Sequence, residues 1–261
     1  MGMSGSGKLK ITLMGTGTSH GIPMIACKCP VCTSCDSRDR RYRCCARVEF
    51  EDKVLIIDTP PEFRLQCLTY DVVKIDAILF THTHADHIFG LDDTRRFTAI
   101  YDRAIRCYGS ARTVASLKSI FPYAFDRESP MISERPQLCA VEVSESFDLF
   151  GRAIIPLELY HGRLSILGYR IGNFAYCTDC SEIPEATYDK LRGLDTLVLG
   201  ALRYTPHPTH FNVEAALAAA GRIGARQTYF THIAHEISHA DLESRLPRHI
   251  RLGFDGLSFE V

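Results

Sequence analysis

The sequence predicts an α/β protein whose sheets are covered by helices. The chain has 261 residues, 46% of them hydrophobic, which is enough to bury a large core in one domain. Its first half is rich in short β-type runs, and strands then alternate with helical segments. This pattern leaves two arrangements open, a doubly wound sheet and a two-sheet sandwich with outer helices.

The expected strands are runs of β-branched and apolar residues that turn residues bound on both sides. The run 76–82 is apolar throughout until it ends in ligand-type residues, which is typical of a strand buried on both faces. Ten strands are expected, at 10–15, 46–50, 53–58, 76–82, 152–161, 165–172, 174–179, 196–202, 226–232 and 256–261.

The expected helices carry signals at their ends. Pro61 and Pro184 stand where a first turn tolerates proline, and Gly193 closes the second of these helices. Asn212 is a good N-cap before an alanine-rich run. Five helices are expected, at 61–68, 112–121, 184–193, 212–224 and 240–246.

The net charge, the lengths of the apolar runs and the first residues limit which binding partners and which cellular compartment are expected. The formal net charge is −1, so no global basic field collects nucleic acid, and stable nucleic-acid binding is not expected. No run of 18 apolar residues predicts a membrane span, so no membrane partner is expected. Residues 1–7 read as a disordered leader or tag without a secretory signal, and residues 8–261 as a single domain. The expected compartment is the cytoplasm.

Eleven cysteines are spread over the chain, and four of them crowd into ACKCPVCTSC. In reducing cytosol disulfides are rare, so scattered cysteines such as Cys67 are expected to be buried small hydrophobes. The C-x-C-x-x-C spacing of Cys27, Cys29 and Cys32 instead lets thiolates converge on one zinc ion. A tetrahedral site needs a fourth ligand, which is either Cys35 or a residue distant in sequence.

The segment FTHTHADHIFGLDD follows an expected buried strand and holds the densest group of metal-ligand residue types in the chain. His82 and His84 point the same way in an extended chain, and the turn at Ala85 brings Asp86 and His87 into the same space. Three imidazoles and a carboxylate are costly to bury without compensation. They indicate a site for Zn²⁺, Mn²⁺ or Fe²⁺, and two ions are expected because one ion rarely takes four ligands from so short a loop.

Three other apolar runs also end in a ligand-type residue. LELYH ends in His161, FAYCTD in Asp179 and TYFTH in His232. Each of them taken singly is compatible with a surface position. Together they supply what a two-metal centre still needs, including a carboxylate that can bridge.

The segment THTHADH is similar to the H-x-H-x-D-H signature of the metallo-β-lactamase superfamily, and the later ligand-type residues follow that family's order. The resemblance covers the chain from GTGTSHGIP to FDGL, and it implies a four-layer αβ/βα sandwich formed by a hydrolase domain. It also implies that Asp58 supports the metal loop from behind. The implied ligands are His82, His84 and His161 for one ion and Asp86, His87 and His232 for the second, with Asp179 bridging.

Within the superfamily, the chain resembles the cyclic phosphodiesterases of the carbon–phosphorus lyase pathway, through GTGTSHGIP, the cysteine loop, THIAH, HFN and FDG. The resemblance implies a structural zinc held by Cys27, Cys29, Cys32 and His235, which would leave Cys35 outside. Cys177 and Cys180 depart from the family pattern and are expected to be packed residues.

The expected function is hydrolysis of a small phosphodiester, such as a ribosyl cyclic phosphate or a nucleotide, by two divalent ions, Zn or Mn. His210 is expected to assist the leaving oxygen, and Asp86 is the second catalytic residue. Arg96, Arg203 and His207 are expected to bind substrate phosphate.

Other functions stay open. A nuclease like tRNase Z shares the metal motif but normally adds a Gly/Lys-rich arm that this chain lacks. Thioester or lactam hydrolases lack the cysteine loop. A metal-storing or redox protein is the non-catalytic alternative. The sequence also leaves open a homodimer.

Overall fold

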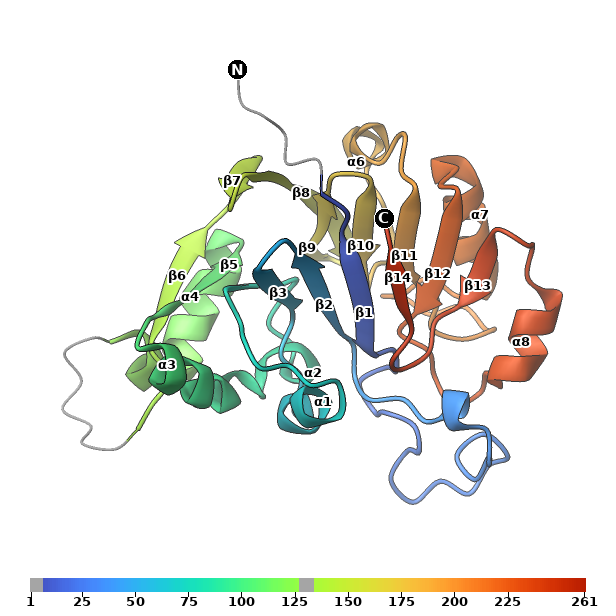
Figure 1. Ribbon diagram of the computed structural model, residues 1–261. Helices are drawn as coiled ribbons and strands as arrows, with labels where there is room; N and C mark the ends of the chain where they lie inside the picture. The colour runs from blue at the N-terminus through green and yellow to red at the C-terminus, as the bar shows by residue number, and fades with distance from the viewer. Residues whose placement is uncertain (1–6, 127–133) are drawn as a thin grey trace.

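Two sheets lie face to face in the computed structural model, which describes residues 7–126 and 134–261 (Figure 1). The expected leader 1–7 lies outside these residues except for Gly7. In the first sheet the strand order is β14 (Ser258–Glu260), β1 (Lys10–Gly15), β2 (Cys45–Phe50), β3 (Lys53–Ile57), β4 (Ala77–Leu79), β5 (Ile105–Gly109) and β6 (Leu138–Glu142). In the second it is β13 (Ile250–Leu252), β12 (Gln227–Thr231), β11 (Thr196–Gly200), β10 (Phe174–Cys177), β9 (Leu164–Ile171), β8 (Arg152–His161) and β7 (Phe147–Leu149).

Helices cover the outer faces of both sheets (Figure 1). Those beside the first sheet are α1 (Phe63–Thr69), α2 (Ala85–Ile88), α3 (Arg95–Tyr101), α4 (Ala111–Ile120) and α5 (Pro122–Phe125). Those beside the second are α6 (Glu185–Lys190), α7 (Val213–Ile223) and α8 (His239–Arg245). Two short 3₁₀ turns, Ser37–Asp39 and Leu91–Thr94, complete the helical elements of the described chain.

Alternate residues of the buried strands pack on opposite faces, one set between the two sheets and the other against the outer helices. In β3, Leu55 and Ile57 join the core between the sheets, whereas Ile56 packs under the helices of the first sheet. In β10, Tyr176 faces the inter-sheet core and Cys177 faces the helices of the second sheet. The layers therefore run helix, sheet, sheet, helix. The predicted four-layer αβ/βα sandwich is confirmed, and the doubly wound sheet is excluded.

Several short elements were not expected from the sequence. The strands β5, β6, β7 and β13 and the helices α2, α3 and α5 are additional to the predicted ones. They have three to seven residues each, too few for a clear hydrophobic period. Of the expected strand 76–82, only Ala77–Leu79 is paired as a strand, and His82 lies beyond its end.

Most strands that carry the site are paired in parallel, whereas β8, which ends in His161, pairs antiparallel with β7 and β9. In the first sheet β3 pairs with β4 and β4 with β5, and in the second β10 pairs with β11 and β11 with β12. Parallel strands end at one edge of a sheet, so residues that follow them lie near one another. No helix among the described residues has the length and apolar character of a membrane span.

Candidate metal centre and active site

Three side chains enter the site from strand ends with an unusual backbone conformation. Asp58, Asp179 and His232 follow β3, β10 and β12, and their φ values are 62°, 58° and 59°. Left-handed conformations are uncommon for residues other than glycine, and they concentrate at functional sites. The turn at each strand end directs the side chain back over the sheet edge.

A first ligand group contains only imidazoles. His82 follows β4, His84 stands before α2 and His161 ends β8. Their ring centroids lie 4.5 Å apart for His82 and His84, 5.6 Å for His82 and His161, and 5.0 Å for His84 and His161. One nitrogen of each ring lies within 4.8 Å of the other two, which is the spacing that a shared cation requires.

A second group combines two imidazoles with two carboxylates. It contains Asp86 and His87 from α2, with Asp179 and His232, and the ligand atoms again lie within 4.8 Å of one another. Asp179 Oδ2 lies 2.9 Å from His232 Nε2 and 3.4 Å from His87 Nε2. Thr178 Oγ1 donates a 2.6 Å hydrogen bond to Asp179 Oδ1 and holds the carboxylate in place.

Hydrogen bonds orient three of the histidine rings through Nδ1. His87 Nδ1 donates to Asp58 Oδ2 at 2.8 Å, and His161 Nδ1 donates to the Thr209 carbonyl at 2.7 Å. His82 Nδ1 lies 3.0 Å from Thr81 Oγ1, whose own proton goes to Asp58. A ring that donates through Nδ1 keeps Nε2 unprotonated, which is how metal-ligating histidines are commonly held.

The donor atoms fit divalent cations. His82 Nε2, His87 Nε2 and both nitrogens of His232 are buried without an aligned hydrogen-bond partner among the described residues. Burial alone would lower the pKa of His87, but the carboxylates of Asp179, Asp86 and Asp58 raise it well above its usual value. A site that concentrates negative charge around unpaired imidazole nitrogens is suited to cations such as Zn²⁺ or Mn²⁺.

A separate group brings the cysteine loop to the loop after β12. The Sγ atoms of Cys27, Cys29 and Cys32 lie 3.3, 3.4 and 3.8 Å from His235 Nδ1. The Cys32 backbone N–H donates to Cys29 Sγ and lowers the pKa of that thiol to about 6. Three sulfurs and one nitrogen within 4.8 Å of one another fit a closed tetrahedral zinc site.

The remaining cysteines of interest lie elsewhere. Cys35 is exposed and does not belong to this group. Cys177 and Cys180 are 0% and 1% exposed and pack in the core beneath the second sheet's helices, so their expected packing role is confirmed.

His210 lies directly beside the metal-ligand groups. Its ring centroid is 4.4 Å from that of His161 and 4.7 Å from that of His232, with which it stacks. Burial and the neighbouring His232 lower the pKa of His210 to about 3. A cavity of about 260 Å³ opens next to His210 and is also lined by His207 and Arg203. Arg96 lines a different groove, between α1 and α3, and the structure does not bring it to this cavity.

Some residues around the site were not singled out from the sequence. Thr81 and Thr209 orient ligand rings, and Cys44 lies beneath the centre with its Sγ 3.5 Å from Thr231 Oγ1. His20 lines the cavity beside His210. Thr209 and Cys44 contact distant segments, which leaves no local signal, and Thr81 connects the neighbouring His82 to Asp58. His20 stands inside GTGTSHGIP, where its residue type was the available signal.

Comparison with known proteins agrees with the fold and the metal-ligand groups described above. The profile of the Beta-lactamase superfamily domain matches residues 53–233. A crystal structure described as a new diphosphatase from the PhnP family is 42% identical, with a TM-score of 0.91 and 97% coverage of both chains. The short form of human tRNase Z is 17% identical, with a TM-score of 0.68 and coverage of 96% of this chain and 98% of its own, which shows the fold alone.

One curated relative is longer than this chain. An octanoyltransferase of Porphyromonas gingivalis (strain ATCC BAA-308 / W83) is 35% identical over 255 residues, which are 95% of this chain and 51% of that protein. The chain thus spans about half the length of this relative, and the named activity is that of the longer protein.

Two packed mixed sheets with histidines and aspartates at their strand ends are the arrangement of the metallo-β-lactamase fold. The chain belongs to the β-lactamase superfamily and, within it, to the PhnP family. The resemblance stated from THTHADH is therefore confirmed. The fold implies binding of divalent metal ions, and both ligand groups and the Cys–His group lie where such ions would be held.

Proposed function

We propose that this protein is a dinuclear-metal phosphodiesterase that hydrolyses small phosphodiesters. The observation that carries the proposal is the position of His210, stacked on His232 and facing a cavity of about 260 Å³ beside the metal-ligand groups. A cavity of this size suits a small substrate. In this proposal His210, which is not a member of either ligand set, assists the leaving group.

The proposed ligand sets are His82, His84 and His161 for one ion and Asp86, His87 and His232 for the other, with Asp179 between them. When bound, the two ions supply Lewis-acid activation of water and of the phosphoryl oxygens.

Other side chains orient the ligand rings and transfer protons in the proposed reaction. Asp58 and the Thr209 carbonyl keep His87 and His161 in the orientation that directs Nε2 inward. Asp86 would accept the proton of the attacking water, and the neutral His210 ring would donate an N–H hydrogen bond to the leaving oxygen. The proton held by Asp86 would return through solvent to that oxygen. The Cys–His group would hold a structural zinc that ties the cysteine loop to the segment carrying His232, because His235 is only three residues further along.

A second candidate is hydrolysis of a diphosphate bond. The 42% identical structure of the PhnP family is named a diphosphatase, and it covers 97% of this chain. Water attacks phosphorus in both reactions, so the same centre would serve either bond. What differs is whether the leaving oxygen belongs to an alcohol or to a phosphate.

A substrate panel tests the proposal with metal-loaded protein. It contains bis-p-nitrophenyl phosphate, 2′,3′- and 3′,5′-cyclic nucleotides, a ribosyl cyclic phosphate, a dinucleoside diphosphate, a precursor tRNA and a β-lactam. We expect turnover of phosphodiesters and none of the lactam or the precursor tRNA. Turnover of the diphosphate alone would select the second candidate. Hydrolysis of the lactam or the tRNA without the small diesters would refute both.

A further inference from the structure

His232 is held in place differently from three other histidines of the centre. The rings of His82, His87 and His161 each have a hydrogen-bonding neighbour at Nδ1. Both nitrogens of His232 are buried without an aligned hydrogen-bond partner among the described residues. The ring stacks on His210, and stacking limits its tilt but not its rotation within the plane. The direction in which the ring nitrogens point therefore depends on the backbone that carries this ring.

The backbone around His232 is anchored on both sides by other segments. The φ value of His232 is 59°, and a left-handed residue other than glycine persists only where its surroundings hold it. After it, Ile233 N donates to Thr16 O at 2.9 Å. Before it, Phe230 O accepts from Gly253 N at 2.8 Å. One anchor comes from near the start of the chain and the other from near its end.

Arg41 joins these two anchors. Its Nη1 donates to Thr16 Oγ1 at 2.7 Å and to Gly253 O at 2.6 Å. The side chain is buried, and burial lowers the pKa of Arg41 to about 10, so the guanidinium is still charged at neutral pH. A buried charge is costly unless it is hydrogen-bonded. Here its bonds go to the two segments that hold the backbone around His232.

The hydroxyl of Thr16 lies at the centre of this cluster. It accepts from Arg41 and donates to Asp255 Oδ1 at 2.7 Å, while Asp255 Oδ2 accepts from Tyr42 N at 2.6 Å. The single hydroxyl proton is thus committed to Asp255, and the hydroxyl oxygen accepts from the guanidinium. The segments GTGTS and FDG, which contain no proposed metal ligand, meet at this hydroxyl.

We propose that Thr16 is a positioning residue for His232. Its hydroxyl, fixed by Arg41 and Asp255, keeps in place the carbonyl that anchors Ile233, and so sets the direction of the His232 ring. The inference rests on the proposed ligand set, in which His232 binds the second ion, and it holds for either phosphoryl bond. It gives GTGTS and FDG a shared part in metal binding although neither supplies a ligand.

The test measures zinc affinity by competition with a chromophoric chelator. Thr16→Val removes the hydroxyl, and we expect the affinity for one of the two active-site ions to fall about tenfold, because losing a group that orients a ligating histidine weakens metal binding. Thr16→Ser keeps the hydroxyl and should retain most of the affinity. Thr12→Val is the matched control, because Thr12 is also a buried threonine of the same segment, but its Oγ1 lies 3.2 Å from Ser258 Oγ, outside the cluster.

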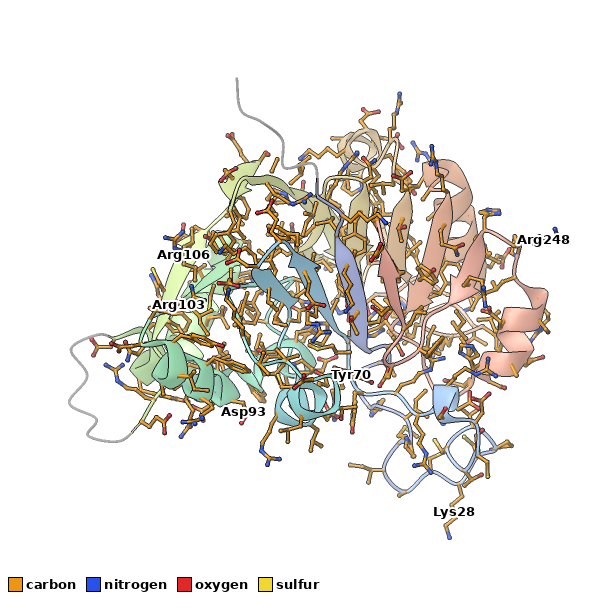
Figure 2. All side chains as sticks on the ribbon, viewed as in Figure 1. Lys28, Tyr70, Asp93, Arg103, Arg106 and Arg248 are labelled. Atoms are coloured by element: carbon orange, nitrogen blue, oxygen red, sulfur yellow. The ribbon has the colours of Figure 1, made fainter. Side chains whose placement is uncertain are left out.

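The surroundings of the cluster favour a folded Thr16→Val protein. A cavity of about 350 Å³ is lined by Arg41, Asp255 and Tyr70, which Figure 2 labels beside α1. Water in this cavity can bond the two charged groups when the hydroxyl is removed. Thermal unfolding of the apoprotein checks the fold. Asp255→Asn is a second variant, since its one acceptor oxygen serves Thr16 or Tyr42 but not both, and it should weaken the same ion.

Wild-type zinc affinity in both Thr16→Val and Asp255→Asn would overturn the positioning role. An equal loss in Thr12→Val or in Thr16→Ser would also overturn it, because the effect would then be a general loosening of the fold. In either case, turnover of bis-p-nitrophenyl phosphate by the wild type leaves the proposed function standing. Zinc binding by His232→Ala as tight as in the wild type would overturn both the ligand set and this inference.

Discussion

Replacing Asp58 by asparagine should weaken metal binding without changing any proposed ligand. Asp58 is fully buried, and its carboxylate accepts three hydrogen bonds. Oδ1 accepts from Thr81 N at 2.8 Å, and Oδ2 accepts from Thr81 Oγ1 at 2.7 Å and from His87 Nδ1 at 2.8 Å. Asparagine has one acceptor oxygen, so no orientation of its amide satisfies all three donors.

The asparagine amide can take two orientations, and each of them loses a hydrogen bond that the Asp58 carboxylate accepts. With the amide nitrogen in the place of Oδ2, His87 must lose its Nδ1 proton to Nε2, the atom that faces Asp179. With the nitrogen in the place of Oδ1, it opposes the backbone N–H of Thr81. Losing one buried hydrogen bond to a charged acceptor costs about 1.5–3 kcal/mol of stability. Removing the partner of a ligating histidine typically weakens metal affinity about 10–100-fold.

Competition with a chromophoric chelator measures the metal affinity of Asp58→Asn, and thermal unfolding of the apoprotein measures its stability. Asp76→Asn is the control, because the Asp76 carboxylate is also buried, accepts from Val54 N at 2.9 Å and pairs with Arg103, but lies away from the ligand groups. We expect Asp76→Asn to lose stability and keep metal affinity. Equal metal affinity in Asp58→Asn and wild type would refute the reasoning.

Three further predictions concern the ions and His210. Elemental analysis of protein purified without added metal should approach three ions per chain, and mild chelation should remove activity before unfolding; a saturated protein with one ion would contradict this. Cys27→Ala and His235→Ala should lower the melting temperature and release zinc, whereas Cys35→Ala should change neither; zinc loss only in the last variant would make Cys35 the ligand. His210→Ala should keep its metals but lose about 10²–10⁴-fold in kcat/KM on alkyl phosphodiesters and less on bis-p-nitrophenyl phosphate, whose leaving group needs no donor; equal losses on both would exclude leaving-group assistance.

Much of the metal centre was predictable because its ligand-type residues stand close together in the sequence or directly after apolar runs. Four ligand-type residues stand within six positions at His82–His87, and a polar ligand after an apolar strand is a strong pattern at His161, Asp179 and His232. Burying such side chains without a cation is costly, so the pattern alone indicates a metal site. The hydrophobic periods likewise determined the class of fold, but not the choice between one sheet and two.

Tertiary structure decided what depends on distance between segments far apart in the chain. Both Cys35 and His235 could complete the cysteine group by residue type, and the loop after β12 brings His235 within 3.3–3.8 Å of the three sulfurs. Arg96 and Arg203 looked equivalent as phosphate ligands, yet only Arg203 lines the cavity at His210. Local sequence records residue type and period, whereas which side chains meet is decided by the packing of the two sheets and the loops at their shared edge.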